Sequence, residues 1–194
     1  MELVKINFEY SKDITAVNRI QFNVHVRLYE GYINKINEID KLLAINKDSD
    51  EANATYSKFR GLKRGETYAL NGVILHEYYF ENMGAFQNGP NYDLISLLVR
   101  DFGSYELWQQ DFVSTANASR GWAILCYDLR SRRLRNISLD SHDLGNIARA
   151  IPLLVLDVYE HAYFLEYADR KADYIHNFMV NINWDVVIDR MNEI

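Results

Sequence analysis

Cysteine, proline and basic charge are all scarce in this sequence. The 194 residues include one cysteine and two prolines, and 27 acidic residues outnumber the 21 lysines and arginines. The single cysteine, Cys126, excludes an internal disulfide and a cysteine-based metal cluster, and its apolar neighbours predict a buried thiol. The net charge of −6 argues against a general binder of nucleic acids or anionic membranes.

Long apolar runs are also missing. None reaches the ~18 residues of a membrane-spanning helix, so we expect no contact with a membrane interior. The first residues, MELVKINFEYSKD, lack the basic segment and apolar core of a signal peptide, which predicts a cytoplasmic protein. Hydrophobic and aromatic residues are plentiful, at 48% and 13%, enough for a sizeable core in one domain or two small ones.

The first half of the chain predicts helices. Apolar residues recur every three or four positions in 15–43, and 65–83 is a second long stretch rich in apolar residues. We therefore expect two long antiparallel helices, separated by the polar stretch 46–54. Glycine, proline, asparagine and aspartate gather in 84–93, which predicts a boundary between a domain 1–88 and a domain 89–194.

The second half mixes helices and strands, which makes the predicted fold class α+β. Two helices are expected in 93–119, broken near Gly103, and two more near 167–178 and 183–191. Between them, 121–130 and 134–140 predict a β-hairpin and 151–159 a third strand.

Histidine is rare, and its placement indicates a metal site. Of five histidines, His25 and His76 fall within the two predicted N-terminal helices, each beside aromatic residues. A buried imidazole needs a partner, so two facing helices favour a shared metal ion, although a satisfied core histidine is the other explanation for each. Asp157 and His161, which follow the apolar run 151–156, would complete a donor set that suits iron, manganese or zinc.

Ordered motifs along nearly the whole chain resemble the iron/manganese superoxide dismutase family. The segment DVYEHAYFLEYADRKADYI is similar to the most diagnostic segment of that family, and LHEYYFENM, DFGSYELW, GWAIL and VNINWDVV occur in the family order. The resemblance implies an N-terminal long-helix hairpin and a C-terminal α/β domain with a three-stranded antiparallel sheet. It also implies the disproportionation of superoxide at one manganese or iron ion per subunit, and the same ligands accept either metal.

The resemblance assigns roles to individual residues. The implied metal ligands are His25, His76, Asp157 and His161. The implied gateway residue is Tyr32, but it follows the first ligand by seven residues where most of the family has eight. Seven residues at ~100° each return close to the starting direction, so we expect Tyr32 and the intervening Tyr29 to share one helix face with the ligand.

Further positions match the surroundings of the metal. Phe80, Trp122 and Tyr159 stand where the family usually has three tryptophans. His142, in SLDSHDLG, matches a position that often holds a glutamine hydrogen-bonded to the metal-bound solvent, and Gly72 does not provide the alternative glutamine of other members. An exposed loop histidine is the other interpretation of His142.

Glu160 and Tyr163 match dimer-interface positions, where the glutamate reaches the ligand histidine of the partner subunit. The resemblance therefore implies a homodimer or a tetramer that acts on superoxide, with neither nucleic acid nor membrane as a partner. The alternative is a catalytically impaired protein of the same fold that serves as a structural or interaction module. The changed gateway and tryptophan positions leave that alternative open.

Overall fold

The computed structural model of the chain describes residues 2–45, 52–84 and 89–194, and it confirms the α+β fold. The elements of the described residues are α1 (Arg19–Ile45), α2 (Lys58–Glu81), α3 (Tyr92–Phe102), α4 (Tyr105–Ala118), β1 (Trp122–Asp128), β2 (Arg133–Leu139), β3 (Ala150–Asp157), α5 (Glu160–Tyr167), α6 (Lys171–Met179) and α7 (Trp184–Asn192). None of the helices in these residues combines the length and apolar character needed to cross a bilayer.

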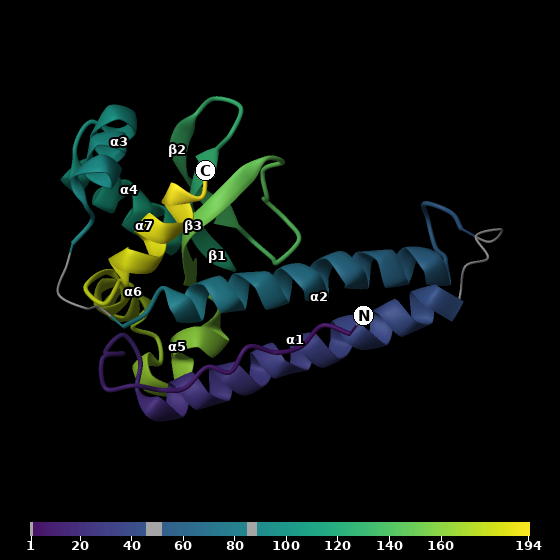
Figure 1. Cartoon of the computed structure of the whole chain (residues 1–194). Helices are drawn as coiled ribbons and strands as arrows, with labels where there is room; N and C mark the ends of the chain where they lie inside the picture. Colours follow the sequence, from purple (N-terminus) through teal and green to yellow (C-terminus); the bar gives the residue numbers. More distant parts are fainter. Residues whose placement is uncertain (1, 46–51, 85–88) are drawn as a thin grey trace.

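Helices α1 and α2 lie antiparallel along each other, as the sequence predicts (Figure 1). The buried residues of α1 follow the helical period of three to four and include Phe22, Ile33 and Ile36. Helix α2 begins earlier than predicted because Ser57 caps it, accepting a hydrogen bond from the Arg60 backbone nitrogen at 3.1 Å. Much of the predicted polar break, at residues 46–51, lies outside the described residues.

The three strands form one antiparallel sheet in the order β2-β1-β3. The central strand β1 is almost wholly buried, and so are the last five residues of β3. Their register places Trp122 opposite Asp157. Cys126 lies buried in β1, which confirms the predicted buried thiol.

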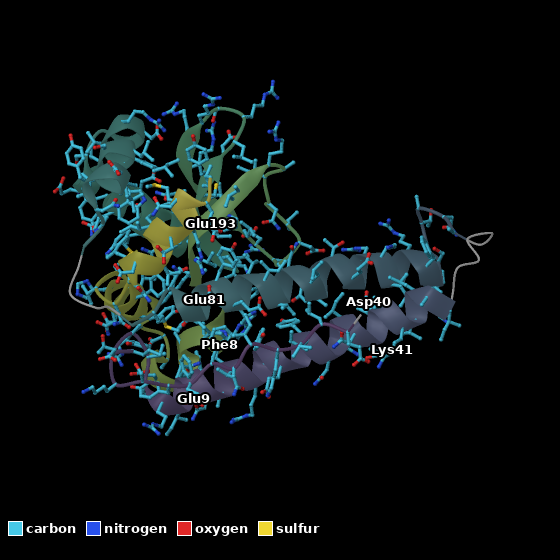
Figure 2. All side chains as sticks on the ribbon, in the orientation of Figure 1. Phe8, Glu9, Asp40, Lys41, Glu81 and Glu193 are labelled. Carbon is cyan, nitrogen blue, oxygen red and sulfur yellow. The ribbon has the colours of Figure 1, made fainter. Side chains whose placement is uncertain are left out.

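The C-terminal sheet and helices pack on one half of the helical hairpin, and the other half projects beyond them (Figure 1). Asp40 and Lys41 lie on the projecting half (Figure 2). The extended N-terminal segment follows the hairpin and packs Phe8 against Tyr29 and Phe80, with ring centroids 5.7 and 5.0 Å apart. The predicted boundary at residues 88 and 89 adjoins residues 85–88, which lie outside the described part, so the two-domain division stays a prediction.

One element near the site was not predicted as a helix. The sequence indicates only a turn after β3, whereas the eight-residue helix α5 begins at Glu160. It packs beside the N-terminal end of α1 (Figure 1). This contact brings the first turn of α5 close to the helix that carries His25.

Candidate metal centre

Four elements each bring one side chain that could bind a metal to the same point. Helix α1 carries His25, α2 carries His76, β3 ends with Asp157, and the first turn of α5 carries His161. One donor atom from each of the four lies within 4.8 Å of the others. The four residues that the sequence singled out therefore converge in the structure.

The cluster is built around one carboxylate oxygen. The Nε2 atoms of His25 and His161 each lie 3.1 Å from Oδ2 of Asp157, and Nε2 of His76 lies 3.6 Å from it. The other carboxylate oxygen accepts a hydrogen bond from the Tyr159 backbone nitrogen at 2.9 Å, which fixes the orientation of Asp157. Three imidazoles thus face an oxygen that has two lone pairs to offer.

The hydrogen bonding of His76 leaves a free lone pair aimed at the carboxylate. Its Nδ1 lies 2.5 Å from the Gly72 carbonyl oxygen, which can only accept, so Nδ1 carries the proton. Nε2 is buried and has no hydrogen-bond partner among the described residues. Two unprotonated groups facing each other in a buried site are unfavourable, and a cation between them removes the repulsion. The donor set therefore fits a metal ion.

Burial and mutual charge set the protonation of the cluster. Burial lowers the pKa of His25 and lowers that of His76 much further, which keeps both rings neutral and able to bind a metal. Burial raises the pKa of Asp157, but the charge and hydrogen bond of His161, together with the hydrogen bond to His25, outweigh it and hold that pKa well below its usual range. Asp157 is thus ionised at any physiological pH.

Aromatic rings enclose the cluster. Phe80 packs on His25 with ring centroids 5.1 Å apart, Trp122 meets His76 edge-on at 5.0 Å, and Tyr159 stacks on His161 at 5.1 Å. The three residues predicted to surround the metal each contact the ring of one of the four clustered residues. They reduce the access of water to the site.

His142 connects this aromatic wall to Tyr32. The Trp122 Nε1–H group donates to Nδ1 of His142 at 2.9 Å, and Nε2 of His142 lies 2.8 Å from the Tyr32 hydroxyl. Because an indole nitrogen can only donate, Nδ1 of His142 is unprotonated. Burial lowers the pKa of His142 to about 4, so the ring is neutral and its Nε2–H donates to Tyr32. The interpretation of His142 as an exposed loop residue is wrong, because the side chain is fully buried.

Comparison with known proteins gives the family. The profile of the C-terminal domain of iron/manganese superoxide dismutases matches residues 90–190. The chain is also 38% identical over 186 residues to an iron superoxide dismutase of Aquifex aeolicus, covering 94% of this chain and 87% of that protein. The chain belongs to the iron/manganese superoxide dismutase family.

Other relatives in this family are named for either metal. A manganese superoxide dismutase of Haloferax volcanii is 36% identical over 163 residues, which cover 83% of this chain and 79% of that protein. An iron superoxide dismutase of Cupriavidus metallidurans is 35% identical over 188 residues, covering 94% and 92%. The similarity to iron/manganese superoxide dismutases thus extends over nearly the whole chain.

The ring of Tyr29 contacts Phe80 with centroids 6.2 Å apart, but its hydroxyl bonds to groups outside the predicted site. Its hydroxyl donates to the Glu77 carboxylate at 2.7 Å and accepts from the Ile6 backbone nitrogen at 2.9 Å. Tyr32 instead faces His142. Tyr29 thus differs from Tyr32 because the N-terminal segment and α2 each offer its hydroxyl a hydrogen-bond partner.

The ring of Tyr32 packs closely against α2 at Gly72. A Cβ atom placed at Gly72 would lie 3.0 Å from the Tyr32 ring. The space that a glutamine at position 72 would need is therefore occupied by the ring of Tyr32, the predicted gateway residue. The absence of the alternative family glutamine has a steric reason in this chain.

Tyr68 is a neighbour of the site that the sequence prediction missed. Its partly exposed ring lies 4.5 Å from the His142 ring and 6.1 Å from the Tyr32 ring, measured between centroids. A sequence signal exists: Tyr68, Gly72 and His76 are spaced by four and so share one face of α2.

The two predicted interface residues lie beside His161. Glu160 is exposed, whereas Tyr163 is buried and stacks on Tyr174 with centroids 5.3 Å apart. Both line an open groove of about 610 Å³, together with His161 and Lys171. His176, for which no role was expected, is exposed on α6.

Proposed function

We propose that this protein catalyses the disproportionation of superoxide to dioxygen and hydrogen peroxide, using one iron or manganese ion held by His25, His76, Asp157 and His161. The observation that carries the proposal is the buried Nε2 atom of His76, which finds no hydrogen-bond partner in the described part of the chain and lies 3.6 Å from Asp157 Oδ2. Membership in the iron/manganese superoxide dismutase family supports the same conclusion. The relatives named for iron and for manganese support both metals as cofactors.

The ion, when bound, supplies the reversible one-electron exchange that superoxide needs in order to be oxidised in one half of the reaction and reduced in the other. The chain supplies the ligand charges. Asp157 contributes one negative charge, and the burial that lowers the pKa of His25 and His76 keeps them neutral. The four ligands therefore leave most of the cation's charge uncompensated, which favours an anionic substrate.

The chain also supplies a route for protons, which peroxide formation consumes. The Tyr32 oxygen accepts from Nε2–H of His142, so its own hydrogen is available for donation toward the site. Burial raises the pKa of Tyr32, which keeps the hydroxyl protonated at neutral pH. We assign Tyr32 and His142 to the holding and transfer of this proton. Tyr29, which bonds to Glu77, is not part of the route.

We further propose a homodimer in which Glu160 of each subunit contacts His161 of its partner. The exposed Glu160 and the groove beside His161 support this arrangement, since a two-fold interface places the same patch on both sides. Sedimentation of the protein at micromolar concentration should show a dimer. A fully active monomer would contradict it. A cytoplasmic location is also proposed, and the single cysteine is consistent with a reducing compartment.

The decisive experiment combines metal analysis with activity. The protein is depleted of metal, reconstituted separately with iron and with manganese, and assayed for superoxide removal. His76→Gln should lose bound metal and activity together, whereas the matched control His176→Gln, at an exposed site on α6, should keep both. A wild-type protein that binds about one metal per chain but does not remove superoxide would favour the structural or interaction module.

A further inference from the structure

A buried glutamine on α1 holds the backbone of the helix that carries His161. Gln21 is fully buried and lies one turn before His25. Its Nε2 donates to the His161 carbonyl oxygen at 2.6 Å, and its Oε1 accepts from the Leu165 backbone nitrogen at 3.2 Å. Both ends of one side-chain amide are thus satisfied by α5.

The two backbone groups that Gln21 contacts belong to one helical turn. A carbonyl and an amide four residues apart are the partners of a single α-helical hydrogen bond. Gln21, on α1, therefore fixes the position of the turn that begins at His161. The same helix carries His25, another histidine of the cluster. Two other hydrogen bonds, from the Asn18 backbone nitrogen to Glu166 and from the Tyr167 hydroxyl to the Ala16 carbonyl, join the residues just before α1 to the far end of α5. Near the beginning of α5, the ring of His161 contacts the ring of His25, with centroids 5.0 Å apart.

At the beginning of α5, Asp157 and Tyr159 hold the side chain of His161, whereas Gln21 bonds the backbone of that turn. Helix α5 has eight residues, and its N-cap residue, Tyr159, makes no side-chain capping hydrogen bond. Helices this short are marginal without tertiary contacts. The side chain of His161 is 30% exposed, whereas those of His25 and His76 are at most 1% exposed. His161 is the least enclosed member of the cluster.

We infer that Gln21 is a positioning residue for the metal site: it holds the backbone at His161 in register with His25, and so sets the geometry of two ligands through one amide. The inference rests on the proposed function only in that His25 and His161 bind the metal. Gln21 touches neither the metal nor the substrate, and it acts through the position of α5.

The test replaces Gln21 in the full-length protein. Gln21→Met keeps the approximate length and removes both hydrogen bonds, and Gln21→Asn keeps an amide that is one methylene too short to reach both groups. The matched control is Asn181→Leu. Asn181 is also buried and also bonds backbone groups through both ends of its amide, at Asp13, Thr15 and Ala16, none of which belongs to α5.

Three quantities are measured: iron or manganese retained against a competing chelator, the visible absorption spectrum of the metal-loaded protein, and the unfolding free energy of the metal-depleted protein. Both Gln21 variants should lose about tenfold or more in metal affinity and shift the spectrum, as expected for a lost outer contact to a ligand. Asn181→Leu should lower the unfolding free energy but leave affinity and spectrum near those of the wild type.

Gln21 variants with wild-type affinity and spectrum would overturn the inference, and so would an equal loss of affinity in Asn181→Leu. If Gln21→Met does not fold, Gln21→Asn decides by the same criteria. The wild type is measured first. Failure of the wild type to bind iron or manganese overturns the proposed function and the inference together, whereas normal binding in all variants overturns the inference alone.

Discussion

Replacing His142 tests the proposed proton route most directly. His142→Ala removes the acceptor of the Trp122 Nε1–H group and the donor to the Tyr32 hydroxyl. Trp122 is fully buried, so its indole N–H would be left without a partner. An unsatisfied buried donor together with the cavity left by an imidazole should lower the unfolding free energy by about 2–4 kcal/mol.

His142→Gln should be milder. A glutamine oxygen can accept from Trp122 while its amide nitrogen donates to Tyr32, so both hydrogen bonds have a replacement. We expect a loss of unfolding free energy below ~1.5 kcal/mol, as for other substitutions that conserve volume. The dismutation rate at equal metal occupancy should fall ~10–100-fold in His142→Ala and clearly less in His142→Gln.

The assay loads each variant with iron and with manganese, measures superoxide removal per bound metal, and measures unfolding by urea after metal depletion. His176→Ala and His176→Gln serve as controls at an exposed position. Bound metal should be unchanged in the His142 variants, because the four clustered residues remain. Equal rates in the wild type and both His142 variants, with either metal, would refute the assignment of His142 to the proton route.

Three further predictions concern stability, each measured by urea unfolding of the metal-depleted protein. The unfolding free energy should fall as the pH drops from 6.5 toward 4, because burial lowers the pKa of His142 to about 4 and the unfolded chain binds a proton that the folded chain excludes. His142→Gln should flatten this part of the profile, and an unchanged slope would contradict it. Gly31→Ala should stabilise the protein by ~0.5–1 kcal/mol, since open space surrounds that helical position, whereas Gly72→Ala should give no such gain because its Cβ would meet the Tyr32 ring at 3.0 Å. Arg190→Met should cost about 2–4 kcal/mol, because it removes a buried cation that bonds Asn82 and the Leu153 carbonyl at 3.1 and 2.9 Å, yet bound metal should not change.

Much of the fold follows from local pattern in the sequence. The apolar period of α1 and the β-branched and apolar runs of β1 and β3 specify those elements, because burying one face or one strand requires that spacing. Element ends were less predictable. The start of α2 depends on the Ser57 cap, and α5 was missed because eight residues carry little periodic signal.

The convergence of His25, His76, Asp157 and His161 was also predicted from the sequence, since each lies in a segment whose structure could be inferred and whose motif resembles the family. What those side chains bond to was decided only by the tertiary structure. Helix periodicity specifies which face of a helix a side chain lies on. The hydrogen-bond partners of that side chain come from other elements. Tyr29 turns to Glu77 and Ile6, and Gln21 reaches α5 across 140 residues of sequence. The sequence by itself thus determined which residues form the cluster, and long-range packing determined which neighbours hold them in place.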